Sequence, residues 1–228
     1  MSRGSGAEAA SPSDGRTGLF LVFEGVEGAG KSTQVRLLAE WLATKGIAHE
    51  VTREPGGTRI GEEIRRLLLL GSDDVPARTE LLLVLAARAA LVESTIAPAL
   101  AAGKVVVADR YEISTLAYQA GGRQLAAERV REINAFATGG LRPDLTVFLD
   151  VPVAVGVSRR EAAGSGADRI EQAGREFHDR VASAYRLLAG TDQGVTRVDG
   201  TAPAERVHAE VVALLKARFA ETFARAMG

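Results

Sequence analysis

The stretch GVEGAGKST, residues 25–33, carries the strongest local signal of fold in this chain. It lies between an apolar run, LFLVFE at 19–24, and an amphipathic run that begins at Lys31. Glycines at this density weaken any helix or strand that contains them. The stretch is therefore expected to serve a purpose other than regular secondary structure.

Residues 25–32 fit the pattern G-x-x-x-x-G-K-[ST]. In such a loop the glycines let backbone N–H groups turn toward a polyphosphate, and the helix that follows points its positive end at the same anion. Lys31 is expected to reach the β- and γ-phosphates, and Ser32 to offer a hydroxyl to Mg²⁺. The pattern requires a preceding strand and a following helix, and both are predicted here.

Short apolar runs alternate with longer amphipathic runs along the rest of the chain. Strands are expected at 19–24, 49–54, 104–110, 144–151 and 194–200, and helices at 31–46, 59–70, 79–101 with a kink near Pro98, 126–140, 153 onward, 175–190 and from about Pro203. This alternation indicates βαβ units. The sequence predicts a three-layer α/β P-loop kinase fold, with a five-stranded parallel sheet covered by helices on both faces.

Length and composition favour a single soluble domain. The chain has 228 residues, 46% of them apolar, and a net charge of −1 that argues against bulk binding to nucleic acid or anionic membranes. No cysteine is present, which excludes disulfides and thiolate chemistry. Residues 1–17 resemble a disordered tail, 18–228 a single domain, and no apolar run of membrane-spanning length is apparent in the sequence. A cytoplasmic location is expected.

Two buried strands end in an acid. KVVVAD ends at Asp109 and DLTVFLD ends at Asp150. The carboxyl end of a strand in an open α/β sheet is where ligands bind. Asp109 is favoured as the second element of the nucleotide site, because Arg110 follows it at once.

Arginines recur at strand ends and in loops: Arg53, Arg65, Arg88, Arg110, Arg159, Arg160 and Arg169. Arginine grips phosphate with two parallel hydrogen bonds. The N-K-x-D signature with which GTPases read their base is absent. Together these features favour an enzyme that clamps a second, phosphorylated substrate over a switch or a motor.

Several motifs in order resemble bacterial thymidylate kinases, members of the P-loop nucleoside monophosphate kinases. They are FEGVEGAGKSTQ, TREPGGT with a downstream GEEIR, AAR, DRYEISTLAYQ, RPDLTVFLDV and DRIE, over about residues 18–215. The resemblance implies transfer of the γ-phosphoryl of ATP to dTMP, giving dTDP and ADP in dTTP synthesis. It also implies Mg²⁺ as cofactor and a homodimer.

The resemblance implies roles for particular residues. Those expected to bind ATP are Gly25, Val26, Glu27, Gly28, Ala29, Gly30, Lys31, Ser32 and Thr33. Those expected around dTMP are Arg53, Glu54, Pro55, Arg65, Val84, Arg88, Arg110, Ser114, Thr115 and Gln119. Arg110 is expected to be nearest the acceptor phosphate, and Arg88 is expected to hydrogen-bond thymine with help from Ser114 or Thr115 and from Gln119.

The remaining implied roles concern metal and lid. Ser32, Asp109 and Glu171 are expected near Mg²⁺. The catalytic residues are expected to be Glu27, Lys31, Arg110, Arg159 and Arg160. Arg159 and Arg160 lie in a lid at about 158–171. Gly28 stands where some family members have a P-loop arginine. Arg159 or Arg160 is therefore expected to contact the γ-phosphate, with Arg169 assisting.

One position departs from the family pattern. Val84 stands where thymidylate kinases usually have a phenylalanine that stacks on the base. Loss of stacking is expected to weaken dTMP binding roughly tenfold or more. Either Val84 or another side chain fills the gap, or the acceptor preference has moved toward another pyrimidine monophosphate. A rival from another class is a non-catalytic NTP-binding switch.

Overall fold

The computed structural model describes residues 17–70, 75–164, 169–170 and 173–224. Its strands are β1 (Leu19–Glu24), β2 (His49–Arg53), β3 (Val105–Asp109), β4 (Leu145–Asp150) and β5 (Val195–Asp199). They form one sheet in the order β2-β3-β1-β4-β5, and every neighbouring pair is parallel. The predicted fold class is confirmed.

The helices fall close to the expected ranges. They are α1 (Lys31–Thr44), α2 (Arg59–Leu70), α3 (Ala77–Leu91), α4 (Ala97–Ala101), α5 (Glu112–Thr115), α6 (Ala127–Thr138), α7 (Val153–Ala162), α8 (Arg175–Thr191), α9 (Ala204–Arg218) and α10 (Ala220–Ala224). The long helix expected at 79–101 is α3 and α4 joined by a wider π-helical segment, η1 (Val92–Ile96). The irregular turns come just before Pro98, whose ring and missing N–H disturb the preceding turn.

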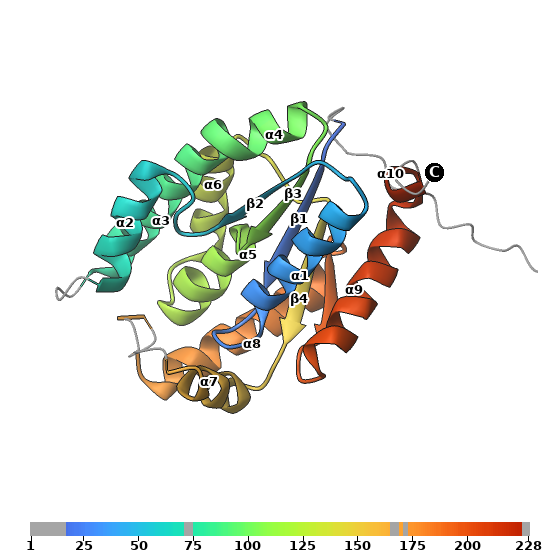
Figure 1. Cartoon of the computed structure of the whole chain (residues 1–228). Coiled ribbons are helices and arrows are strands. Elements are labelled where there is room, and N and C mark those ends of the chain that lie inside the picture. The colour runs from blue at the N-terminus through green and yellow to red at the C-terminus, as the bar shows by residue number, and fades with distance from the viewer. Residues whose placement is uncertain (1–16, 71–74, 165–168, 171–172, 225–228) are drawn as a thin grey trace, which may run out of the picture.

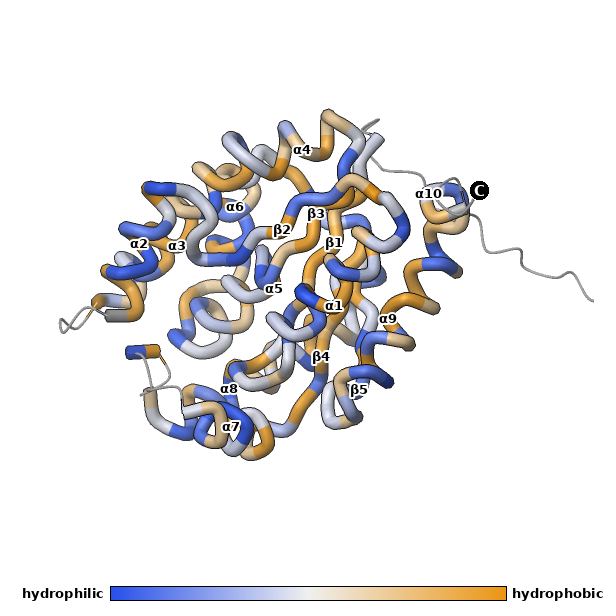
Figure 2. Tube along the Cα trace, in the orientation of Figure 1, coloured by the Kyte–Doolittle hydropathy of each residue, from blue (hydrophilic) through white to orange (hydrophobic). Residues whose placement is uncertain are grey.

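Alternating side chains of the central strand face different helices. Leu19, Leu21 and Phe23 of β1 pack in the cluster that contains Leu38 of α1. Phe20 and Val22 pack with residues of α3 and α4. Period-2 alternation with both sets buried is what a parallel sheet between two helical layers requires. Figure 1 shows α1 and α9 on the viewer's side of the strands, and Figure 2 shows the apolar strands enclosed by helices with polar outer faces.

The order of the strands sets the position of the site. β1 has β3 on one side and β4 on the other; the connection that leaves β1 runs toward β2 at one edge, whereas those that leave β3 and β4 run toward the opposite edge, which makes β1 a topological switch point. Ligands in open α/β sheets bind beyond the carboxyl ends of the strands at such a switch point. The P-loop follows β1 at this edge, and Asp109 and Arg110 follow β3 beside it.

The helical stretch Ala77–Ala101 is apolar and long enough, by length and composition alone, to span a membrane. The expectation that no apolar run reaches membrane-spanning length is therefore wrong for this stretch. Glu80 and Arg88 within it are buried and ion-paired to other parts of the fold. It packs on α2 and α6, so we read it as a core helix.

Candidate active site

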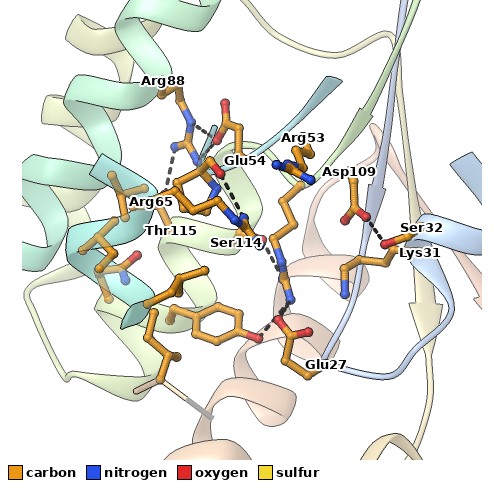
Figure 3. A pocket seen from close by; sticks show the side chains of 18 residues that line it. Glu27, Lys31, Ser32, Arg53, Glu54, Arg65, Arg88, Asp109, Ser114 and Thr115 are labelled. Carbon is orange, nitrogen blue, oxygen red and sulfur yellow. Dashed lines mark hydrogen bonds and ion pairs between the residues drawn. The ribbon is translucent and has the colours of Figure 1, made fainter. Parts of the chain in front are cut away.

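A cavity of about 280 Å³ lies at the carboxyl edge of the sheet (Figure 3). The P-loop and the end of β3 contribute Glu27, Lys31, Ser32, Asp109 and Arg110 to its wall. The remaining lining residues come from 53–55, from α2 and α3, from the segment after Tyr111 and from Ile170. Residues separated by more than a hundred positions therefore enclose one space.

The side chain of Lys31 folds back over the P-loop. Lys31 is 6% exposed, and its Nζ donates a 2.9 Å hydrogen bond to the Val26 carbonyl. Burial, followed by the positive charge of Arg110, lowers the pKa of Lys31 from its ordinary value, against the opposing effect of Glu27 and Asp109. A phosphate beside this ammonium would favour its charged form.

Position 28 has no room for a side chain. Gly28 has φ 72°, and a Cβ there would lie 2.1 Å from the Gly156 carbonyl oxygen in α7. The P-loop and the first turns of α7 are thus packed backbone to backbone. This explains why a P-loop arginine cannot stand at this position, and it brings the helix that carries Arg159 and Arg160 against the loop.

Glu27 and Arg110 form an ion pair at the cavity wall. Burial raises the pKa of Glu27, but Arg110 and Lys31 outweigh that effect and lower the pKa to about 2. Glu27 is therefore ionised at neutral pH. Arg110 has a φ of 77°, a left-handed conformation rare for residues other than glycine, and its backbone N–H donates to the Phe23 carbonyl at 2.9 Å.

The side chain of Arg110 is held from several sides. It donates to the Gly25 carbonyl at 3.1 Å and to the hydroxyls of Ser114 and Tyr185 at 3.0 Å. Burial lowers the pKa of Arg110, but Tyr118 and Glu27 lead the effects that raise it well above its usual value. A permanently charged guanidinium is thus fixed between the P-loop and the cavity.

Sequence reasoning missed the buried carboxylate behind this arginine. Glu24 ends β1 and is 0% exposed. It accepts hydrogen bonds from the backbone N–H groups of Tyr111 and Ser114 and from the hydroxyls of Ser114 and Tyr185. An acid directly before the P-loop was the available signal, whereas nothing local marks Tyr185 in α8.

Arg88 is fully engaged in the interior. It is 1% exposed and donates to Glu54, Thr115, Asn134 and the Tyr111 carbonyl, so all its N–H groups have protein partners. Glu54 Oε1 is buried and has no hydrogen-bond partner among the described residues. Burial leads the effects that raise the pKa of Glu54, despite the opposing charge of Arg88. An orphaned carboxylate oxygen at a cavity wall is suited to a ligand hydroxyl or water.

The other predicted acceptor-site residues reach the cavity with different partners. Arg53 pairs with Glu62 at 3.1 Å, and Arg65 donates to the Pro55 carbonyl at 2.9 Å. The Ser114 hydroxyl donates to Glu24, and its oxygen accepts from Arg110. Val84 packs with Ile64, Leu68 and Ala87, and Tyr118 is the aromatic residue in the described wall. The predicted acceptor-site residues Arg53, Glu54, Pro55, Arg65, Val84, Arg88, Arg110, Ser114, Thr115 and Gln119 all line the cavity.

The lid arginines occupy three different environments. Arg159 donates to the carbonyls of Gly200 and Thr201 at 2.8 and 3.2 Å. Arg160 lines a small cavity of about 40 Å³ together with Glu27 and His178. Arg169 donates to Glu80 at 2.7 Å and to the Leu68 carbonyl at 2.9 Å, which places it at α2 and α3 instead of at the P-loop.

The oxygen atoms expected to hold Mg²⁺ are adjacent. Ser32 Oγ donates a 2.6 Å hydrogen bond to Asp109 Oδ2 (Figure 3). Hard oxygen ligands of this kind suit Mg²⁺, which keeps several waters and binds through one or two protein groups and the substrate phosphates. The described residues contain no cluster of three or more histidine or acidic side chains that could hold a metal. Glu171, the third predicted ligand, lies outside the described residues.

Asp150, the alternative strand-end acid, has a different environment. It is 8% exposed and pairs with Arg186 at 3.2 Å and Arg197 at 2.5 Å. It does not line the cavity at the P-loop. The geometry therefore separates the two acids, with Asp109 at the cavity and Asp150 in an ion-pair cluster with α8 and β5.

Comparison with known proteins matches this arrangement. The sequence profile described as Thymidylate kinase matches residues 23–211. A thymidylate kinase of Fervidobacterium nodosum is 46% identical over 87% of this chain and 99% of that protein. Thymidylate kinases of Trichormus variabilis and Pseudomonas savastanoi are 46% and 49% identical, over 90% and 87% of this chain and 98% and 95% of their own lengths. With its P-loop, strand-end acid and arginine-lined cavity, this chain belongs to the thymidylate kinase family.

Proposed function

We propose that this chain transfers the γ-phosphoryl group of ATP to dTMP, giving ADP and dTDP, a step toward dTTP. One observation carries the proposal. A single cavity has the phosphate-binding lysine and hydroxyl, Lys31 and Ser32, in one part of its wall, and Val84, Thr115 and Gln119 in another. Such a cavity suits a phosphate at one end and a flat, partly apolar base at the other.

Positioning and charge neutralisation account for most of the catalysis in phosphoryl transfer. In the proposed complex, Gly25–Thr33 hold the ATP phosphates and Lys31 spans the β- and γ-phosphates. Arg53, Arg65 and Arg110 hold the acceptor phosphate, with Glu27 orienting Arg110 through their ion pair. The nucleophile is an ionised phosphate oxygen, so no side chain needs to act as a strong base.

Mg²⁺ fits the donor set of Ser32 and Asp109. When bound, the ion would neutralise charge on the phosphates of ATP. The role of these two residues is to hold the ion and its waters beside the P-loop. Glu171 remains a proposed additional ligand.

The acceptor nucleoside is proposed to lie against Glu54, Pro55 and Val84. The unpartnered Glu54 Oε1 would accept a hydrogen bond from a sugar hydroxyl. The N–H groups of Arg88 are all engaged by protein partners, but Thr115 Oγ1 accepts from Arg88 at 2.8 Å and keeps its own hydrogen for a carbonyl of the base. Arg88 would then act on thymine either through Thr115 or by exchanging one of its present partners.

Arg160 is the better placed lid arginine. It shares a small cavity with Glu27, and its charge contributes to lowering the pKa of Glu27. Arg159 is anchored to two backbone carbonyls near the start of α9. We propose that Arg160 meets the charge that develops on the transferred group.

We further propose a cytoplasmic homodimer without nucleic acid or membrane partners. Large apolar side chains are exposed on helices that pack side by side, α2, α3 and α6. They are Ile60, Leu67, Leu82 and Phe136, and Phe136 is 88% exposed. A twofold pairing through these helices would cover them.

The test is ADP release with Mg-ATP and a panel of dTMP, dUMP, dCMP, dGMP and AMP. Turnover with dTMP far above the other acceptors is expected. Preference for another pyrimidine monophosphate would support the alternative acceptor. ATP binding without turnover on any acceptor would favour the switch and overturn the kinase proposal.

A further inference from the structure

Glu80 is a buried carboxylate just behind the wall of the main cavity. It lies in the first turn of α3 and is 0% exposed. Its oxygens accept from Gln119 Nε2 at 2.9 Å, from Arg123 at 3.1 and 3.0 Å and from Arg169 at 2.7 Å. Gln119 lines the cavity, whereas Glu80 and Arg123 do not. Glu80 thus touches the site only through its partners.

The charge of Glu80 determines which way the Gln119 amide points. Burial raises the pKa of Glu80, but hydrogen bonds from Arg123, Gln119 and Arg169 outweigh it, and the pKa lies below its usual value. An ionised carboxylate only accepts hydrogen bonds. The amide must therefore present its NH₂ group to Glu80, and the assignment of its nitrogen and oxygen follows from chemistry.

The other end of this amide is left for a ligand. Within the described part of the chain, Gln119 Oε1 accepts no hydrogen bond. It is not among the side-chain atoms that are both fully buried and unpartnered, so part of its surface is accessible. Because Gln119 lines the cavity, this oxygen is open to it. The wall therefore offers a hydrogen-bond acceptor whose polarity Glu80 holds in place.

We propose that Glu80 is a positioning residue for base specificity, which acts by locking the Gln119 amide with its oxygen toward the acceptor base. The proposal rests on the proposed function. At ring position 3 thymine carries an N–H donor, whereas cytosine carries an acceptor. A fixed acceptor facing that position pairs with thymine and leaves cytosine with two facing acceptors. A site whose polar group is left unpaired rejects the wrong ligand strongly.

Arg169 gives Glu80 a second connection to the cavity. Its guanidinium binds Glu80 and the Leu68 carbonyl, and its backbone N–H donates to the Leu69 carbonyl at 3.3 Å. Ile170, the next residue, lines the cavity with Leu68 and Leu69. The same carboxylate thus binds the Gln119 amide and the arginine that precedes Ile170 in the chain.

The test compares kcat/KM for dTMP and dCMP in wild type, Glu80→Gln and Arg123→Gln. A neutral amide at position 80 donates as well as accepts, so Gln119 is free to turn its NH₂ group to the cavity. In Glu80→Gln we expect the dTMP to dCMP ratio to fall at least about tenfold, the scale of one hydrogen bond, mainly through KM. Arg123→Gln removes a partner of Glu80 but leaves its bond to Gln119, so the ratio should stay near the wild-type value.

Equal losses for both acceptors in Glu80→Gln would overturn the proposal, because a merely structural role lowers both together. If Glu80→Gln does not fold, wild type is assayed with dTMP and its 3-deaza analogue, which has C–H in place of N3–H. A KM at least about tenfold higher for the analogue is expected, and equal KM values would overturn the proposal. Failure of wild type to use dTMP at all would instead refute the proposed function.

Discussion

Ser32 Oγ lies 2.6 Å from Asp109 Oδ2, which links the first turn of the P-loop helix to the end of β3 across 77 positions of the chain. The parallel pairing of β1 with β3 sets this contact, because it aligns Phe23 with Asp109 just before the two loops begin. The consequence is a pair of oxygen atoms beside the phosphate-binding loop, where we propose that Mg²⁺ binds.

Asp109→Asn is expected to lower kcat by at least about tenfold and to raise the Mg²⁺ concentration needed for half-maximal rate, because a charged ligand becomes neutral. Rates measured across a Mg²⁺ titration at fixed ATP check this. Asp150→Asn is the matched control, since Asp150 also ends a buried strand but pairs with Arg186 and Arg197. It should change stability and leave the Mg²⁺ dependence unaltered.

Arg160→Ala is expected to reduce kcat by about 10³ or more, the scale of an arginine that neutralises transferring phosphate. Arg159→Ala should have a smaller effect on kcat, because Arg159 is bound to the carbonyls of Gly200 and Thr201. Steady-state kinetics with both substrates saturating separate the two variants. A reversal of their order would move the catalytic role to Arg159.

Val84→Phe is expected to lower the KM for dTMP roughly tenfold, because an aromatic ring at this wall position would stack on the base. The comparison is between KM values for dTMP in wild type and variant. Leu187→Phe is the control, because Leu187 is 68% exposed on α8 and does not line the cavity. A raised KM in Val84→Phe would mean that the base occupies the space a phenylalanine needs.

The ion pair between Glu27 and Arg110 should show in the pH dependence of stability. The pKa of Glu27 is about 2 in the folded protein, below the usual 4.5. A depressed carboxyl pKa contributes stability that is present above the unfolded-state value and is lost as pH falls from about 4.5 toward 2. The difference in free energy of unfolding between wild type and Glu27→Gln should therefore shrink across this window and stay constant from pH 5 to 8. Urea titrations at each pH provide the measurement.

Charges placed on the exposed apolar faces of α2 and α3 should prevent self-association. The double variant Leu67→Arg, Leu82→Arg is expected to sediment as a monomer, while wild type sediments as a dimer. Leu187→Arg adds a charge at an equally exposed apolar position on another helix and should leave the dimer intact. A wild type that is monomeric at micromolar concentration would contradict the proposed pairing.

The fold class, the P-loop and the family could be predicted from the amino-acid sequence alone. These follow from local signals: period-2 and helical spacing, a glycine-rich loop between a strand and a helix, and motifs of fixed spacing. Asp109 could be ranked above Asp150 only by its neighbour Arg110, and the lid arginines could not be ranked at all. A single residue outside a motif gives no local indication of which distant side chains it will contact in the folded protein.

The contacts between distant side chains follow from how the elements pack in three dimensions. Glu24 and Tyr185, 161 positions apart, meet behind Arg110, and Glu80 meets Arg169 from 89 positions away. Arg110 adopts its left-handed backbone because the surrounding contacts hold it there. Buried charges need partners from wherever the fold brings them, so their pairing follows from the packing of whole elements and leaves no periodic pattern in the chain.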